Sequence, residues 1–154
     1  MVAGLVALAV VVAAAVWPPR FPEPDPRPNI VVIITDDQPY DSLSHDPPIM
    51  PYLQGQIEDP SGHWISFPNA FVETPLCCPS RSTVLTGRTS SHTGVGSNED
   101  GHLFDDSSTL ATWLDDAGYR TGLVGKYLNG YPFGRKPFVP PGWDVWAGKQ
   151  QGSS

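Results

Sequence analysis

Two short segments of the chain combine residue types that can carry out chemistry, and the first is a pair of carboxylates. Asp36 and Asp37 follow an apolar run that ends at Ile34, with Thr35 between the run and the pair. Adjacent carboxylates of this kind suit a hard cation such as Ca²⁺ or Mg²⁺. Taken alone, the same dipeptide more often caps a turn. The pair by itself therefore leaves a cation site and a turn cap open.

The second segment places a cysteine next to a helix start and an arginine. It begins Cys77-Cys78-Pro79-Ser80-Arg81. Pro79 suits the first position of a helix, which would put Cys77 just before the N-terminus, where amides and the helix dipole favour a thiolate or a bound oxyanion. Arg81 can bring a bidentate donor to the same place. The pattern indicates an anion site beside a nucleophile, and a structural pair of buried cysteines remains the alternative.

The elements that must position these residues are predicted to form an α/β fold. Residues 30–34 are a continuous β-branched run, typical of a strand buried on both faces in a parallel sheet, and they end at the Asp36-Asp37 pair. Residues 107–109 can cap an amphipathic helix over residues 110–114, with Gly118 as its stop signal. Residues 119–125 then predict a second strand. Helix and strand together form half of a βαβ unit, so a mostly parallel sheet flanked by helices is expected.

Composition and charge limit the possible partners and the location of the protein. The 154 residues carry a formal net charge of −7 with no run of Lys or Arg, which argues against a nucleic-acid surface. Residues 2–17 lack polar side chains, which predicts a signal peptide or membrane anchor over residues 1–17. A proline-rich linker follows over residues 18–28. We therefore expect an exported protein, secreted or membrane-anchored on the extracytoplasmic side, with residues 29–154 as its folded part.

The cysteine segment resembles the signature of the type I sulfatases. The matching residues are Cys77-x-Pro79-Ser80-Arg81-x-x-x-Leu85-Thr86-Gly87-Arg88, and residues 28–37 and 125–129 look like two further motifs of that family, in the family's order. The resemblance implies an alkaline-phosphatase-like α/β fold, with residues 29–154 as its N-terminal portion. Leu128 stands where many family members have a histidine. This variant, with residues 139–146, looks like the branch of N-acetylglucosamine-6-sulfatases and heparan endosulfatases, which suggests a sulfated amino sugar as substrate.

The resemblance also implies a role for each matching residue. Cys77 would be oxidised by a separate formylglycine-generating maturation enzyme, and the hydrated aldehyde would attack the sulfur of a sulfate ester. Asp36 and Asp37 match ligands of the family's Ca²⁺, which is favoured over Mg²⁺, and the modified Cys77 would complete this part of the metal site. Arg81 matches the residue that steadies the nucleophile, and Lys126 the residue that bridges it to the bound sulfate.

Three functions are compatible with this resemblance. The first is a sulfuric ester hydrolase acting on a sulfated small molecule or glycan. The second is a phosphonate or phosphodiester hydrolase of the same superfamily, and the third is a non-catalytic exported remnant in which Cys77 stays a thiol. Family members run to several hundred residues, and further metal ligands and sulfate-binding side chains come from their later parts. We therefore expect the 154-residue chain alone to be poorly folded and inactive.

Overall fold

A computed structural model describes residues 25–149, and the chain falls into two units that divide between Thr35 and Asp36. The first unit is described over residues 25–35 and the second over residues 36–149. The predicted signal peptide or anchor, residues 1–17, and linker residues 18–24 lie outside the described residues. Across residues 25–149, none of the helices has the length and apolar character needed to cross a bilayer.

Residues 30–34 are not assigned to a strand in the described structure, so the predicted first strand is wrong there. Their side chains are exposed, from 45 % for Ile34 to 84 % for Ile33. A buried parallel strand is stabilised by hydrogen bonds to a neighbour and by packing on both faces. Within the described part of its own unit, residues 25–35, the segment has neither. The apolar run predicts a capacity for burial but does not identify the partner that would provide it.

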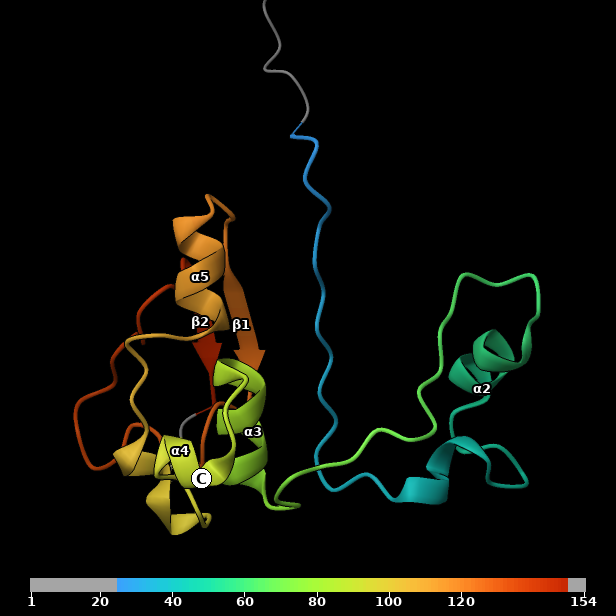
Figure 1. Ribbon diagram of the computed structural model, residues 1–154, viewed down its shortest axis with the longest axis horizontal. Coiled ribbons are helices and arrows are strands. Elements are labelled where there is room, and N and C mark those ends of the chain that lie inside the picture. Colours follow the sequence, from blue (N-terminus) through green and yellow to red (C-terminus); the bar gives the residue numbers. More distant parts are fainter. Residues whose placement is uncertain (1–24, 150–154) are drawn as a thin grey trace, which may run out of the picture. The chain divides into compact units, whose positions relative to one another are not determined.

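The second unit consists of short helices and a small parallel sheet (Figure 1). The strands β1 (Gly122–Gly125) and β2 (Val145–Gly148) pair in parallel, with Gly122 opposite Val145. The fold class is therefore α/β with a parallel sheet, as predicted, and β1 and β2 are the strands of the described part. The helical elements are η1 (Tyr40–Leu43), α2 (Pro51–Glu58), α3 (Cys77–Thr86), α4 (Ser90–Thr93), η2 (Glu99–Leu103) and α5 (Leu110–Asp116).

Helix α5 confirms the predicted helix and its capping signal. The Thr109 hydroxyl accepts a hydrogen bond from the Thr112 amide, and the Thr112 hydroxyl accepts one from the Thr109 amide, which forms a capping box. Gly118 follows with φ of 78°. The Tyr119 amide still bonds to the carbonyl of Leu114, 2.9 Å away. Because the helical turn extends this far, β1 begins at Gly122 and not at residue 119.

Helix α3 starts earlier than the sequence predicts. Cys77 is its first residue, after Leu76 in an extended conformation, and Pro79 is its third. Proline is tolerated here because the first amides of a helix have no intrahelical acceptor. Gly87 ends the helix in the left-handed region, at φ of 66°. Cys77 thus lies in the first turn of α3 and not just before it, but it is still at the helix N-terminus, as predicted.

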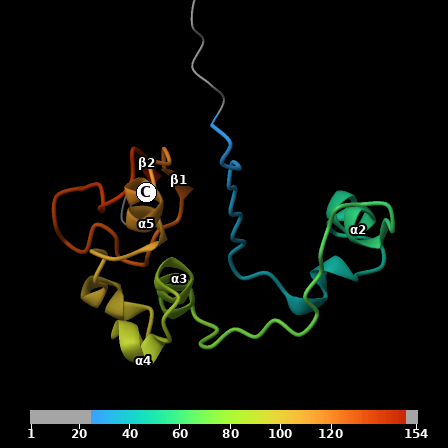
Figure 2. The same ribbon diagram turned by 45° about the horizontal axis from the view of Figure 1, so that its top comes forward.

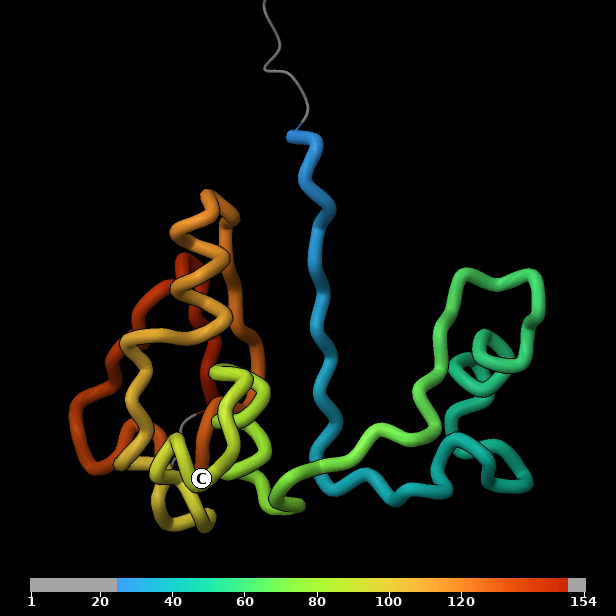
Figure 3. The backbone as a smooth tube through the Cα atoms, viewed as in Figure 1, coloured from blue at the N-terminus to red at the C-terminus, as the bar shows by residue number. Residues whose placement is uncertain are grey.

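The connection between the two strands supplies most of the hydrophobic core. Residues 126–144 leave the sheet after β1 and return to β2 without a helix (Figure 3). Tyr131 is 1 % exposed, and the Tyr127 ring contacts those of Tyr131 and Trp146 edge-on, at centroid distances of 5.9 and 5.1 Å. Helix α5 lies beside the sheet in two views (Figures 1 and 2). Packing in this aromatic core holds the loop of residues 126–144, which begins at Lys126, in position.

Candidate active site

The structure brings together an aspartate, an arginine and a lysine from three distant parts of the sequence. The Lys126 ammonium lies 2.7 Å from Oδ2 of Asp36, and an Arg81 Nη2 lies 3.6 Å from Oδ1 of the same carboxylate. Arg81 also donates from Nη1 to the backbone carbonyl of Lys126 at 2.7 Å. Arg81 reaches this point from α3, and Lys126 follows β1 directly. The carboxylate thus holds two cations at one place.

Cys77 lies within this group of charges. It is the first residue of α3, the helix that also carries Arg81. The ligand atoms of Asp36, Asp37 and Cys77 all lie within 4.8 Å of one another. Asp37 has φ of 53°, a left-handed conformation that aspartate tolerates better than most residues. The five residues that the sequence singles out are therefore neighbours.

The ion pair shifts the protonation of both its members toward the charged forms. The hydrogen bond from Lys126 lowers the pKa of Asp36, and it outweighs the opposing effect of partial burial. Burial by itself would lower the pKa of Lys126, but the hydrogen bond with Asp36 outweighs it and raises that pKa. At neutral pH the site therefore contains a carboxylate, an ammonium and a guanidinium.

The donor set of this cluster fits a hard cation only in part while Cys77 is a thiol. Asp36 and Asp37 offer carboxylate oxygens, which Ca²⁺ prefers, whereas sulfur is a soft ligand. Replacement of the Cys77 sulfur by oxygen would make all three donors hard. Ca²⁺ takes about six to eight oxygen ligands, so this cluster would provide part of a complete coordination shell.

Cys78 is a structural residue whose hydrogen-bond partners the sequence did not reveal. It is fully buried, its amide donates to Oδ1 of Asn98 at 3.0 Å, and its sulfur accepts from the Asn129 amide at 3.0 Å. Burial raises the pKa of this thiol. Gly101 packs so closely that an added Cβ would come within 3.3 Å of the sulfur. Asn98 carried no sequence signal, whereas Asn129 belongs to the motif at residues 125–129.

Fold and site together define a class of protein: an α/β domain with a nucleophilic side chain at a helix N-terminus, beside paired carboxylates and two cations. The sulfatase family profile matches residues 28–143. The chain therefore belongs to the sulfatase family. No solved structure gives a significant match.

Curated relatives carry the same family name. An "Extracellular sulfatase SULF-1 homolog" of Drosophila melanogaster is 38 % identical over 128 residues, covering 79 % of this chain and 11 % of the relative. An "Arylsulfatase" of Volvox carteri is 39 % identical over 125 residues, 76 % of this chain and 19 % of the relative. An "N-acetylglucosamine-6-sulfatase" of Homo sapiens is 32 % identical over 139 residues, 82 % of this chain and 24 % of the relative. The chain thus spans between about a tenth and a quarter of the length of these relatives.

Proposed function

We propose that the protein containing this chain hydrolyses sulfate esters, with Cys77 as the precursor of its nucleophile. The observation that carries the proposal is the cluster of Cys77 with Asp36 and Asp37, in which Asp36 also pairs with Lys126 and Arg81. The names of the relatives support the sulfate ester as substrate. The Drosophila melanogaster relative, which is named an extracellular sulfatase, also supports an exported protein.

Each residue of the site has a task that follows from its position. A formylglycine made from Cys77 by a maturation enzyme would supply a hydrated aldehyde, and a Ca²⁺ ion held by Asp36 and Asp37 would favour its ionised form. Lys126 and Arg81 keep positive charge beside this atom, where a sulfate group carries its negative charge. Arg81 is 11 % exposed and bonded to the backbone, so its guanidinium is fixed before substrate arrives.

The substrate class and the larger fold extend the same proposal. We expect a sulfated amino sugar, because one relative is named for N-acetylglucosamine 6-sulfate chemistry. The sheet of β1 and β2 would be part of a larger, mostly parallel, alkaline-phosphatase-like sheet. Residues 1–154 alone are expected to be inactive, because the Asp36, Asp37 and Cys77 cluster provides too few ligands for Ca²⁺.

The test is the activity of the intact gene product that contains this chain, produced together with a formylglycine-generating enzyme. Lys126→Met should lower kcat/KM for 4-nitrophenyl sulfate by about a hundredfold or more, as for the loss of one charge-stabilising donor. Lys136→Met is the matched control, because Lys136 is exposed, and should leave the rate unchanged. Cys77→Ala should abolish turnover.

Two results would contradict the proposal. One is full activity of the Cys77→Ala variant. The other is faster hydrolysis of an aryl phosphodiester than of the aryl sulfate by the matured protein, which would favour a phosphodiester hydrolase. Mass spectrometry of the peptide that contains Cys77 reports its conversion independently of any activity.

A further inference from the structure

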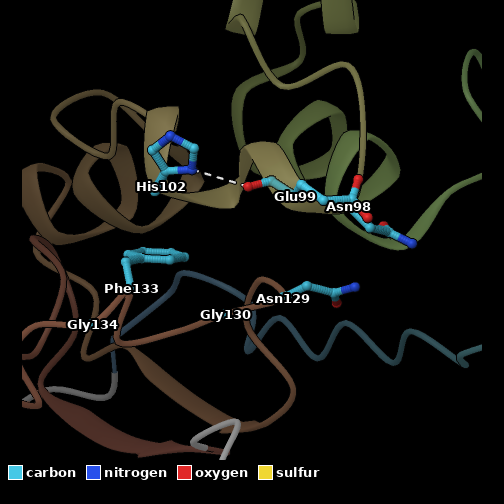
Figure 4. A pocket seen from close by; sticks show the side chains of 7 residues that line it. All are labelled: Asn98, Glu99, His102, Asn129, Gly130, Phe133 and Gly134. Atoms are coloured by element: carbon cyan, nitrogen blue, oxygen red, sulfur yellow. Dashed lines mark hydrogen bonds between the residues drawn. The ribbon is translucent and has the colours of Figure 1, made fainter.

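A cavity of about 500 Å³ lies between η2 and the loop that follows Lys126 (Figure 4). Its volume falls within the range of roughly 300–1,000 Å³ that is typical of small-molecule sites. None of the catalytic steps above uses it. The side chains that line it are those of Asn98, Glu99, His102, Asn129 and Phe133.

The polar lining of this cavity suits a neutral, hydroxyl-rich ligand. Two amides, a carboxylate and an imidazole provide both hydrogen-bond donors and acceptors. Neither Lys nor Arg is among the lining residues, so an anion such as sulfate would find no cation here. The His102 ring is oriented by a 2.9 Å hydrogen bond between its Nδ1 and the Glu99 carbonyl, drawn as a dashed line in Figure 4.

Phe133 forms an apolar wall in an unusual backbone conformation. Its φ is 60°, and a non-glycine residue held in the left-handed region costs about 1–3 kcal/mol, a strain that is concentrated at ligand sites. The ring packs edge-on against Tyr131, at 6.0 Å between centroids and 86° between planes. Gly130 and Gly134 line the cavity beside it without side chains. Figure 4 shows the ring on the side of the cavity opposite His102.

Two of the lining residues are bonded to the neighbour of the nucleophile. Asn98 accepts from the Cys78 amide, and the Asn129 amide donates to the Cys78 sulfur, each at 3.0 Å. Cys78 directly follows Cys77 in α3. Two residues of the cavity wall are therefore bonded to the residue that follows Cys77, whereas Lys126 and Arg81 do not line the cavity.

We propose that this cavity binds a pyranose unit of the sulfated substrate. Hydroxyl or acetamido groups of the sugar would pair with Asn98, Glu99 and His102, and the C–H face of the ring would lie against Phe133. The neutral part of the substrate and its sulfate group would thus be recognised by separate sets of residues. This inference rests on the proposed sulfatase function and adds the surface that selects a sugar over another alcohol.

The test compares two substrates with the intact, matured protein. Phe133→Ala and Glu99→Gln should each lower kcat/KM for a 6-sulfated N-acetylhexosamine by about tenfold, the value of one aromatic or charged contact. The same variants should leave kcat/KM for 4-nitrophenyl sulfate, which has no sugar, within about twofold of the parent. Phe71→Ala is the matched control, because Phe71 is 91 % exposed, and should change neither substrate.

An equal loss on both substrates would assign Phe133 and Glu99 a structural role and overturn the proposal, as would unchanged rates on both. A binding measurement separates this from failure of the sulfatase proposal. Saturation-transfer NMR with an unsulfated methyl N-acetylhexosaminide should give a signal with the Cys77→Ala protein that is lost on adding Phe133→Ala. Absence of that signal in the Cys77→Ala protein refutes the sugar site even if sulfate esters are hydrolysed.

Discussion

The hydroxyl group of Tyr131 allows one consequence of the core to be worked out in detail. Its O–H donates to the carbonyl of Phe138, and its oxygen accepts from the Phe138 amide at 3.2 Å and from the Trp146 indole at 3.1 Å. A hydroxyl has one donor and two acceptor positions, so all three are used. Tyr131→Phe removes them together and leaves two N–H groups and a carbonyl without this partner.

The expected cost follows from these three bonds. Each contributes about 1 kcal/mol net, so the substitution should destabilise the region by about 3 kcal/mol. Trp146 belongs to β2 and Phe138 to the connecting loop, so the loss of local stability should appear in both segments. At about 1.4 kcal/mol per factor of ten, hydrogen exchange of the amides in these segments should accelerate roughly a hundredfold.

Hydrogen exchange measured by mass spectrometry on the intact protein gives this quantity for peptides covering residues 131–148. Tyr40→Phe is the matched control, because the Tyr40 side chain is 95 % exposed and the same atom is removed. The reasoning would be refuted if Tyr131→Phe accelerated exchange no more than Tyr40→Phe. It would also be refuted if the acceleration were confined to residue 138, because the bond to Trp146 would then contribute nothing.

Three further predictions concern local structure and pH. Thr109→Ala removes the capping box of α5 and should destabilise it by about 1 kcal/mol, seen as faster exchange over residues 110–116. Gly142→Ala should prevent accumulation of folded protein, because φ is 80° and the new Cβ would overlap the α5 backbone. Gly94→Ala is the control, with φ of 73° and open space around the new Cβ. It should lower the free energy of unfolding by only about 1–2 kcal/mol, and the protein should still fold. Burial raises the pKa of Asp106. The protonated Asp106 carboxyl therefore contributes stability that is fully present below its unfolded pKa and is lost as the pH rises through its folded pKa. Asp106→Asn should raise the melting temperature at pH 7 and not at pH 3.

The parts of the fold with local signals could be predicted from the sequence. Helix α5 has its cap at Thr109 and its stop at Gly118, and both lie within a few residues of it. Strand β2 escaped prediction because it is four residues long and exists through pairing with β1 across the intervening loop. Residues 30–34 show the reverse error, since a strong local pattern forms no strand in the described structure.

The candidate site was predicted for a different reason. No local rule joins Asp36 to Lys126, which are 90 positions apart, and the resemblance to a known family placed them together. In the structure the two side chains form an ion pair at 2.7 Å, and the roles of the site residues stay predictions. Neither periodicity nor resemblance indicated the bonds of Cys78 to Asn98 and Asn129, because hydrogen bonds between residues so far apart in the chain leave no pattern in the sequence.

The exposed apolar run at residues 30–34 has a consequence for solubility. Five consecutive β-branched residues without charge are the kind of segment that nucleates cross-β association. Pro28 stands on one side of the run and Asp36-Asp37 on the other, and proline and like charges flanking such a segment oppose stacking with another copy. The two aspartates thus act as gatekeepers during synthesis, before any cation can be bound. Neutralising them to test the proposed cation site should therefore also promote aggregation of the newly made chain.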